Sequence, residues 1–409
     1  MQRVRTLQIE ETAKFPKVEE FLNRKSRRSQ QTKKSYLIAL AHFQTFLSNS
    51  HYDYNIQSIL MPLSQKSIDI YSVFNDFVDY LLSRKDNFTT KLSPATISFY
   101  IAGVKSYLEY YEIDIISKKF QNKVTLPDKY HGNTEGIDID DIRNILEACD
   151  NTRLKAFILV LASSGMRALE ACSLRNCDID FSSSPSKVHI RAVTTKTKQA
   201  NDIYISDEAT KKVQAFIESK YKSAFDSAMT EFPNELVFGK EKEVKPINIY
   251  KRLQENFAAL LKNLGMDKRR DGEGMQRREI SFHSFRRFTK STISNLGLGD
   301  YSEWMLGHRS SMAARYYYTK EQERREIYKK CMKYLTILDY RTVEAVGKDF
   351  ESKLQERDQE IEELQNKIVH YEMEEQENKK EVENMRDYVN KRIQELNRKI
   401  TTTKEKQKT

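Results

Sequence analysis

A heptad repeat near the C-terminal end is the feature that most constrains how this chain can fold. Counted in sevens from Leu354 to Leu396, every position is apolar except Glu375. The position three residues further on holds Leu364, Tyr371, Asn378 and Met385, with Arg357 and Arg392 fitting less well. This spacing predicts a helix over residues 345–400 that self-associates through 350–400 as a coiled coil. The alternative is a single solvated helix rich in Glu and Lys. Either form leaves the globular fold to the first 340 residues.

Residues 1–116 are expected to form a small helical domain. In the stretch 29–48, apolar residues recur at the spacing of one helix face, and the stretch "YSVFNDFVDYLLSR" repeats the pattern. A third helix begins at "SPAT", where Ser93 can cap the first turn and Pro94 fits the first helical position.

The next segment, residues 117–136, is polar and basic without helical periodicity, so we expect a linker there. Residues 137–340 then predict a second domain. Its sequence indicates two helices, a tight turn at Gly165, and another helix. The stretch "KVHIRAVTTKTKQANDIYIS" alternates apolar and polar residues on both sides of a polar turn, which indicates a β-hairpin. The predicted fold class is therefore mainly α with a small antiparallel β-hairpin or sheet (α+β).

Charge points to a polyanionic partner. The chain carries a net charge of +10. Residues from Lys348 onward hold 14 Lys+Arg and 16 Asp+Glu, a net −2, so the first 347 residues carry +12. A basic body of this kind favours nucleic acid as the partner, although charge alone is weak evidence.

Composition indicates a cytoplasmic protein. No run of about 18 apolar residues is present to cross a bilayer, so no membrane is expected. The first residues, "MQRVRTLQIEETAKF", lack the apolar region of a secretory signal. The four cysteines are scattered and lack a second ligand pair at zinc spacing, which favours reduced thiols.

Two stretches of the second domain place basic residues where they could meet an anion. In "SSGMRALEACSLR", Gly165 permits a tight turn, Arg167 starts a helix, and Glu170 follows one turn later. In "TTKTKQAND", Lys196 lies at the predicted hairpin tip. Taken singly, each has a simpler interpretation, namely a surface arginine and a solvated charged turn.

Two further stretches add histidines and tyrosines. In "FHSFRRF", His283 and Arg286 lie three residues apart on one face of a helix beginning near Ser284, unless His283 packs under the neighbouring phenylalanines. In "WMLGHRSSMAARYYYT", His308 lies in a Gly-containing turn before three consecutive tyrosines.

Together these groups suit phosphoryl transfer. Two guanidinium groups can hold the negative charge of a phosphodiester transition state. A tyrosine nucleophile has an unperturbed pKa of about 10 and needs a base or a strongly cationic site. A lysine can protonate the leaving 5′ oxygen. No acidic cluster of the metal-ligand type accompanies the set.

The order of these residues resembles the tyrosine recombinase family, which includes phage integrases and Xer recombinases. The resemblance covers roughly residues 138–320, and residues 15–115 look like the family's core-binding domain. Arg167, Lys196, His283, Arg286 and His308 match the family's catalytic positions, and Glu170 matches the acidic position after the first arginine. Two departures are "SSGMR" in place of the commoner Thr-Gly-Leu-Arg and a hairpin without Gly-Lys-Gly. The heptad tail is not a general family feature.

The resemblance implies a covalent reaction on double-stranded DNA. A tyrosine attacks the scissile phosphate, forms a 3′-phosphotyrosine link and frees a 5′-hydroxyl, with neither ATP nor metal required. It implies that Arg167 and Arg286 hold the phosphorane and that Lys196 protonates the leaving oxygen. His283 assists proton transfer at the tyrosine, and His308 bonds a phosphate oxygen. The family works as a homo-tetramer on DNA, and such an enzyme would be associated with the nucleoid.

The nucleophile is expected to be Tyr317. In similar proteins it lies nine residues after the histidine of "LGH", and position 317 is nine after His308. Consecutive helical residues point about 100° apart, so one ring of the three can face the phosphate. A one-residue slip would select Tyr316 or Tyr318 instead.

Integration or excision of a mobile element is the expected role. Xer-type dimer resolution, a telomere resolvase and a type IB topoisomerase share the chemistry. A catalytically decayed DNA-binding architectural protein is the non-enzymatic alternative.

Overall fold

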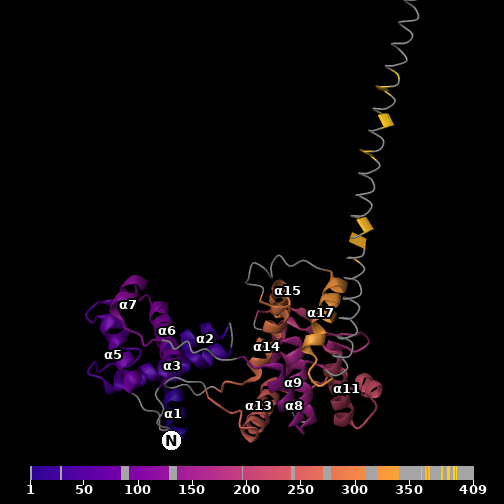
Figure 1. The fold of residues 1–409 in the computed structure, drawn as a ribbon. Helices are drawn as coiled ribbons and strands as arrows, with labels where there is room; N and C mark the ends of the chain where they lie inside the picture. The colour runs from indigo at the N-terminus through magenta and orange to yellow at the C-terminus, as the bar shows by residue number, and fades with distance from the viewer. Residues whose placement is uncertain are drawn as a thin grey trace, which may run out of the picture.

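The computed structural model describes residues 2–27, 30–83, 92–128, 136–195, 197–240, 245–269, 278–308 and 320–339, with scattered residues between 361 and 393. Helices dominate these ranges, and three short strands form one antiparallel sheet. The predicted fold class is confirmed. Figure 1 shows helices α1–α7 gathered in one lobe and the elements from α8 onward in another.

Amphipathic helices build the first lobe around its own apolar core. Leu40, Phe43 and Leu47 of α3 lie in this core with Phe74 and Phe77 of α5, all almost fully buried. The expected Ser93 cap is present, since its hydroxyl accepts the Thr96 N–H at 3.3 Å. The helices are α1 (Gln2–Ala13), α2 (Pro16–Ser26), α3 (Gln30–Asn49), α4 (Leu60–Ser64), α5 (Ile70–Ser83), α6 (Pro94–Tyr110) and α7 (Ser117–Lys123).

Helix α7 was not expected, because its residues fall in the predicted linker. Phe120 of this helix and Val124 just after it are buried in the first lobe's core, and Phe120 packs edge-on against Phe74. The prediction that 117–123 lack helical structure was therefore wrong. One buried aromatic suffices to dock a two-turn helix, and such a short helix gives no periodic signal.

The second lobe is organised around α9 (Thr152–Ser164), which is buried on all sides. Its sequence "AFILVLASS" is apolar or small around the whole helix, the pattern of a central core helix. Elements packed against it are α11 (Asp207–Tyr221), α13 (Pro246–Asn263), α14 (Phe282–Asn295), α17 (Glu321–Leu335) and β3 (Asn201–Ile205).

The predicted hairpin is confirmed. Strand β2 (Ser186–Ile190) pairs antiparallel with β3, with Val188 opposite Ile203, and β1 (Ile179–Asp180) adds a short edge. The connection holds a 3₁₀ turn, η2 (Ala192–Thr194), so the tip is broader than a tight two-residue turn.

The remaining elements surround the site. They are α8 (Ile139–Glu147), α10 (Ala168–Ala171), the 3₁₀ turn η1 (Asn176–Asp178), α12 (Phe225–Glu231) and α15 (Gly299–Met305). Among the described residues, every helix is too short or too polar to traverse a bilayer.

Candidate active site

A glycine turn between α9 and α10 begins the site. Gly165 ends α9 with φ +64°, a left-handed conformation that favours glycine. A Cβ atom there would lie 2.6 Å from Leu306 Cδ2 and 3.2 Å from Thr289 Cβ. The turn therefore allows α9 to approach both α14 and the loop after α15.

Arg167 follows this turn and is fixed by Glu170. The Glu170 carboxylate accepts the Arg167 backbone N–H at 3.0 Å and its Nη1 at 2.9 Å. Glu170 is buried, whereas the Arg167 side chain is 33% exposed. The buried carboxylate thus orients a guanidinium whose outer side faces solvent.

Arg286 lies deeper and is tied to the C-terminal ends of two helices. Its Nη1 donates to the Gly165 carbonyl at 2.7 Å, and its Nη2 donates to the Leu306 carbonyl at 2.7 Å. These carbonyls lie just beyond α9 and α15, where helix dipoles are negative. Burial, and next the charge of Arg167, lower the pKa of Arg286 to about 10. The group stays cationic at neutral pH.

His308 contacts Arg286 directly. Its Nε2 lies 2.9 Å from Arg286 Nη2, and its Nδ1 lies 2.9 Å from Glu303 Oε2. Gly307, with φ +68°, turns the chain after α15 to bring the ring back over α14. The structure therefore brings Arg167, Arg286 and His308 to one place.

His283 is exposed on the first turn of α14. This helix begins at Phe282, two residues earlier than expected, with Ser281 at the N-cap position. Phe282 and Phe285 point into the core, and Phe282 packs against Phe157 and Phe257. The alternative of a histidine buried under these rings is contradicted, because His283 points the other way.

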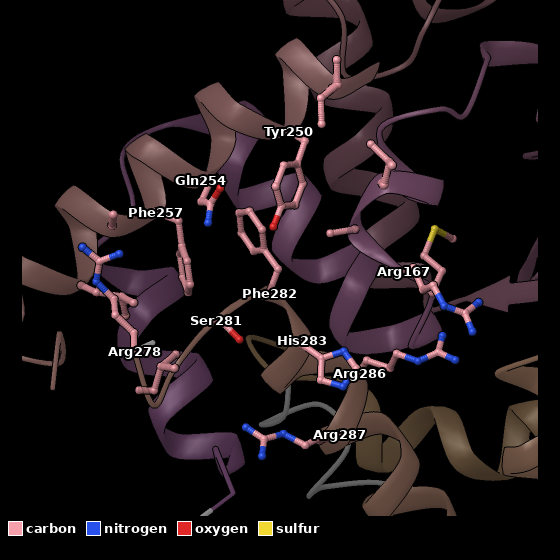
Figure 2. Close-up of a pocket in the computed structure, with 17 residues that line it drawn as sticks. Arg167, Tyr250, Gln254, Phe257, Arg278, Ser281, Phe282, His283, Arg286 and Arg287 are labelled. Carbon is pink, nitrogen blue, oxygen red and sulfur yellow. The ribbon is translucent and has the colours of Figure 1, made fainter. Parts of the chain in front are cut away.

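A cationic pocket of about 860 Å³ is lined by Arg167, His283 and Arg286, whereas His308 contacts Arg286 without lining the pocket. Figure 2 shows Arg167, His283 and Arg286 on one side of it and the aromatic rings of Tyr250, Phe257 and Phe282 further in. Arg278 and Arg287 also line it, and none of its described lining residues is acidic. A cavity with this lining attracts a polyanion.

The hairpin tip reaches the same arginines. Thr195, Thr197 and Asn201 line a small second cavity together with Arg167 and Arg286. Lys196 itself lies outside the described residues. Its described neighbours border the site, as a contact between the hairpin tip and the phosphate would require.

The tyrosines Tyr316, Tyr317 and Tyr318 also lie outside the described residues. Both described ends of their segment are held in the second lobe. His308 is in the site, and α17 is anchored at its start, where Tyr204 Oη donates to the Glu321 carbonyl at 3.2 Å. Lys187 forms an ion pair with Glu321 at 3.0 Å.

Sequence reasoning missed several residues around the site. Glu303 and Lys290 form an ion pair at 2.5 Å beside His308, and Arg278 and Arg287 line the pocket. Arg278 lies at the end of the run "KRRDGEGMQRR", whose charge was a usable signal. Glu303 had no such signal in the sequence, because its partner Lys290 lies on another helix and its partner His308 lies beyond a turn.

Comparison with known proteins finds similar sequences and structures. Residues 135–324 match the model of the Phage integrase family. Tyrosine recombinase XerA of Saccharolobus solfataricus is 26% identical over 125 residues, covering 31% of this chain and 39% of the relative. The chain thus aligns with about two fifths of that relative's length.

Solved structures with detectable similarity include XerH site-specific recombinase bound to difH substrate, with a TM-score of 0.48 and 16% identity over 76% of this chain and 81% of that one. A transposon integrase from Tn1549, in complex with transposon right end DNA, gives a TM-score of 0.43 and 15% identity over 70% and 97% of the two chains.

Proposed function

We propose that this chain, whose residues 135–324 match the model of the Phage integrase family, is a site-specific DNA recombinase that cleaves and rejoins DNA through a 3′-phosphotyrosine link. The observation that carries this proposal is the meeting of Arg167, His283 and Arg286 at a pocket without a described acidic lining residue, with His308 in contact with Arg286. Two guanidinium groups and two imidazoles in that setting suit a phosphodiester whose charge increases in the transition state.

The proposed first step balances as a transesterification. The phenol oxygen of Tyr317 forms a bond to the phosphorus while the bond from phosphorus to the 5′ oxygen breaks. The phenol proton leaves with help from His283, and Lys196 supplies a proton to the 5′ oxygen. Arg167 and Arg286 hold the non-bridging oxygens, and His308 bonds one of them. One phosphodiester is exchanged for another, so rejoining needs no external energy source.

The assay that tests this function uses DNA nicked next to the cleavage site, so that the freed strand diffuses away and the covalent link accumulates. The purified chain is incubated with DNA from the borders of its element and analysed by denaturing electrophoresis. Tyr317→Phe should bind DNA without forming the adduct, whereas Tyr316→Phe and Tyr318→Phe should form it. If Tyr316→Phe or Tyr318→Phe lost the adduct instead, that tyrosine would be the nucleophile. Absence of any adduct with the unmodified chain would favour a DNA-binding architectural protein.

The biological role we propose is integration or excision of a mobile element by a homo-tetramer on two DNA duplexes. The first lobe would act as the core-binding domain and clamp DNA together with the catalytic lobe. Such an enzyme would work in the cytoplasm, on the nucleoid. In the joined product, exchanged strands indicate recombination, hairpin ends indicate a telomere resolvase, and relaxed circles indicate a type IB topoisomerase.

The tail is proposed to self-associate as a coiled coil through residues 350–400. The side chains of Ile361, Leu364 and Ile368 share one heptad face and are 52%, 53% and 57% exposed in the isolated chain. An apolar stripe of this kind on a helix can be buried against the identical stripe of a second copy. In a recombinase the pairing would hold protomers together before or during synapsis.

A further inference from the structure

We infer that Glu303 is a positioning residue that fixes the imidazole of His308 against Arg286. The inference rests on the proposed function, because it concerns how His308 meets a phosphate oxygen. Its basis is a chain of contacts between α14 and the end of α15, in which Arg286 meets His308, His308 meets Glu303, and Glu303 meets Lys290.

The first step is the assignment of the His308 protons. A carboxylate carries no N–H or O–H, so the 2.9 Å contact between Glu303 Oε2 and His308 Nδ1 requires a proton on Nδ1. An arginine can only donate, so the 2.9 Å contact between Arg286 Nη2 and His308 Nε2 requires a lone pair on Nε2. The DNA-free site therefore holds His308 as the neutral Nδ1–H tautomer.

The second step concerns what changes when a phosphate arrives. A phosphate oxygen accepts hydrogen bonds, so His308 must donate to it from Nε2. Nε2 must then take up a proton from solvent as DNA binds, so that the ring becomes an imidazolium. Glu303 serves both states, because Nδ1–H donates to it in each and its negative charge compensates the ring's positive charge. Arg286 and Nε2 would then both be donors, and the phosphate oxygen would lie between them.

The third step is how Glu303 itself is held. Its second oxygen, Oε1, lies 2.5 Å from Lys290 Nζ. Lys290 is four residues after Arg286 on α14, hence on the same face of that helix. The end of α15 is held from the sheet side, where Asn201 Nδ2 donates to the Met305 carbonyl at 3.1 Å. Glu303 is thereby aligned with one oxygen toward His308.

The test measures covalent adduct formation in single turnover. Glu303→Gln keeps the shape but removes the charge, and we expect a rate about 10- to 100-fold lower, the usual effect of losing the partner that orients a working imidazole. DNA affinity should be unchanged. Glu326→Gln is the control, because Glu326 pairs with Lys329 at 2.8 Å in the same lobe and neither residue lines the pocket. This control should retain the full rate.

A double-variant comparison separates positioning from a merely structural role. If Glu303 acts through His308, Glu303→Gln should slow the enzyme little once His308→Ala is present. The inference would be overturned if the double variant were slowed by the product of the two single-variant factors. An unchanged rate in Glu303→Gln alone would overturn it as well. Selective ¹⁵N-histidine NMR of the DNA-free protein should assign the Nδ1–H tautomer to His308 and show that signal changed in Glu303→Gln. If the unmodified chain forms no adduct, the proposed function fails, whereas the NMR result tests the positioning of the ring by itself.

Discussion

At the residue scale, Arg286 shows how a buried positive charge is stabilised by hydrogen-bond acceptors. The side chain is 5% exposed, yet its guanidinium meets two helix-end carbonyls and one imidazole. Removing a charge from water is costly unless it is compensated, and these acceptors supply that compensation. The result is a cation whose position is fixed before DNA binds.

Gly165 makes this arrangement possible, because its backbone turns at the end of α9 and its carbonyl accepts a hydrogen bond from Arg286. Gly165→Ala should lower the free energy of unfolding by about 2–5 kcal/mol, because it combines left-handed strain with an overlap at Leu306. Urea denaturation measures the change. Gly265→Ala is the matched control, since Gly265 has φ +68° and nothing within 4 Å of its added Cβ. It should lose only about 1–2 kcal/mol for the strain. Equal losses at the two sites would show that the contact with Leu306 is unimportant.

At the element scale, a buried carboxylate attaches the segment just after α17 to the rest of the second lobe. Glu208 of α11 accepts the backbone N–H groups of Ile337 and Leu338 at 2.8 and 2.7 Å. Burial raises the pKa of Glu208, and these two hydrogen bonds offset part of that rise. On the other side, Arg143 Nε donates to the Ile337 carbonyl at 3.2 Å. Residues 337–338, which precede the tail, are therefore held in place from two sides.

Glu208→Ala should lower the free energy of unfolding by about 2–6 kcal/mol, because two backbone N–H groups lose their acceptor at about 1–3 kcal/mol each. Glu208→Gln should cost less, since its amide oxygen still accepts. Urea denaturation measures both, with the exposed Glu147→Ala of α8 as control, expected within about 0.5 kcal/mol of the unmodified chain. An unchanged free energy of unfolding in Glu208→Ala would mean that the backbone N–H groups of 337–338 find other acceptors.

At the scale of the whole molecule, the tail should determine how copies associate. Deleting residues 345–409 should lower the mass measured by light scattering without DNA, and slow recombination. Full-length Ile361→Lys with Ile368→Lys should do the same, because it places charges on the heptad face. Asn366→Lys, on the outer face of the repeat, is the control and should leave the mass unchanged. An unaltered mass and activity after the deletion would refute a role in assembly.

The charge distribution makes a second prediction at this scale. The first 347 residues carry +12, so DNA binding should release many counterions. For about 6–10 phosphate contacts, the affinity should fall about 10³- to 10⁵-fold between about 50 and 200 mM salt. Fluorescence anisotropy with labelled duplex measures this. An affinity that is flat over that range is incompatible with two lobes clamping the phosphate backbone.

How much the sequence predicted depended on how local each feature is. Three helices of the first lobe (α3, α5 and α6), the Gly165 turn and the hairpin were predicted, because each follows from a periodicity or a turn residue within a few positions. Helix α7 was not predicted, since a single buried Phe120 holds it. The roles of Lys196 and Tyr317 stay predictions, because both lie outside the described residues.

The sequence by itself determined the set of chemical groups and their order along the chain, and these carry the resemblance to the tyrosine recombinase family. Only the tertiary structure decided how the groups are held. Arg286 meets the Gly165 carbonyl across 121 residues, and Glu303 orients His308 while paired to Lys290 on another helix. Such contacts arise when packing of α14 and α15 on α9 brings distant backbone carbonyls and carboxylates together, and no local pattern in the chain encodes that packing.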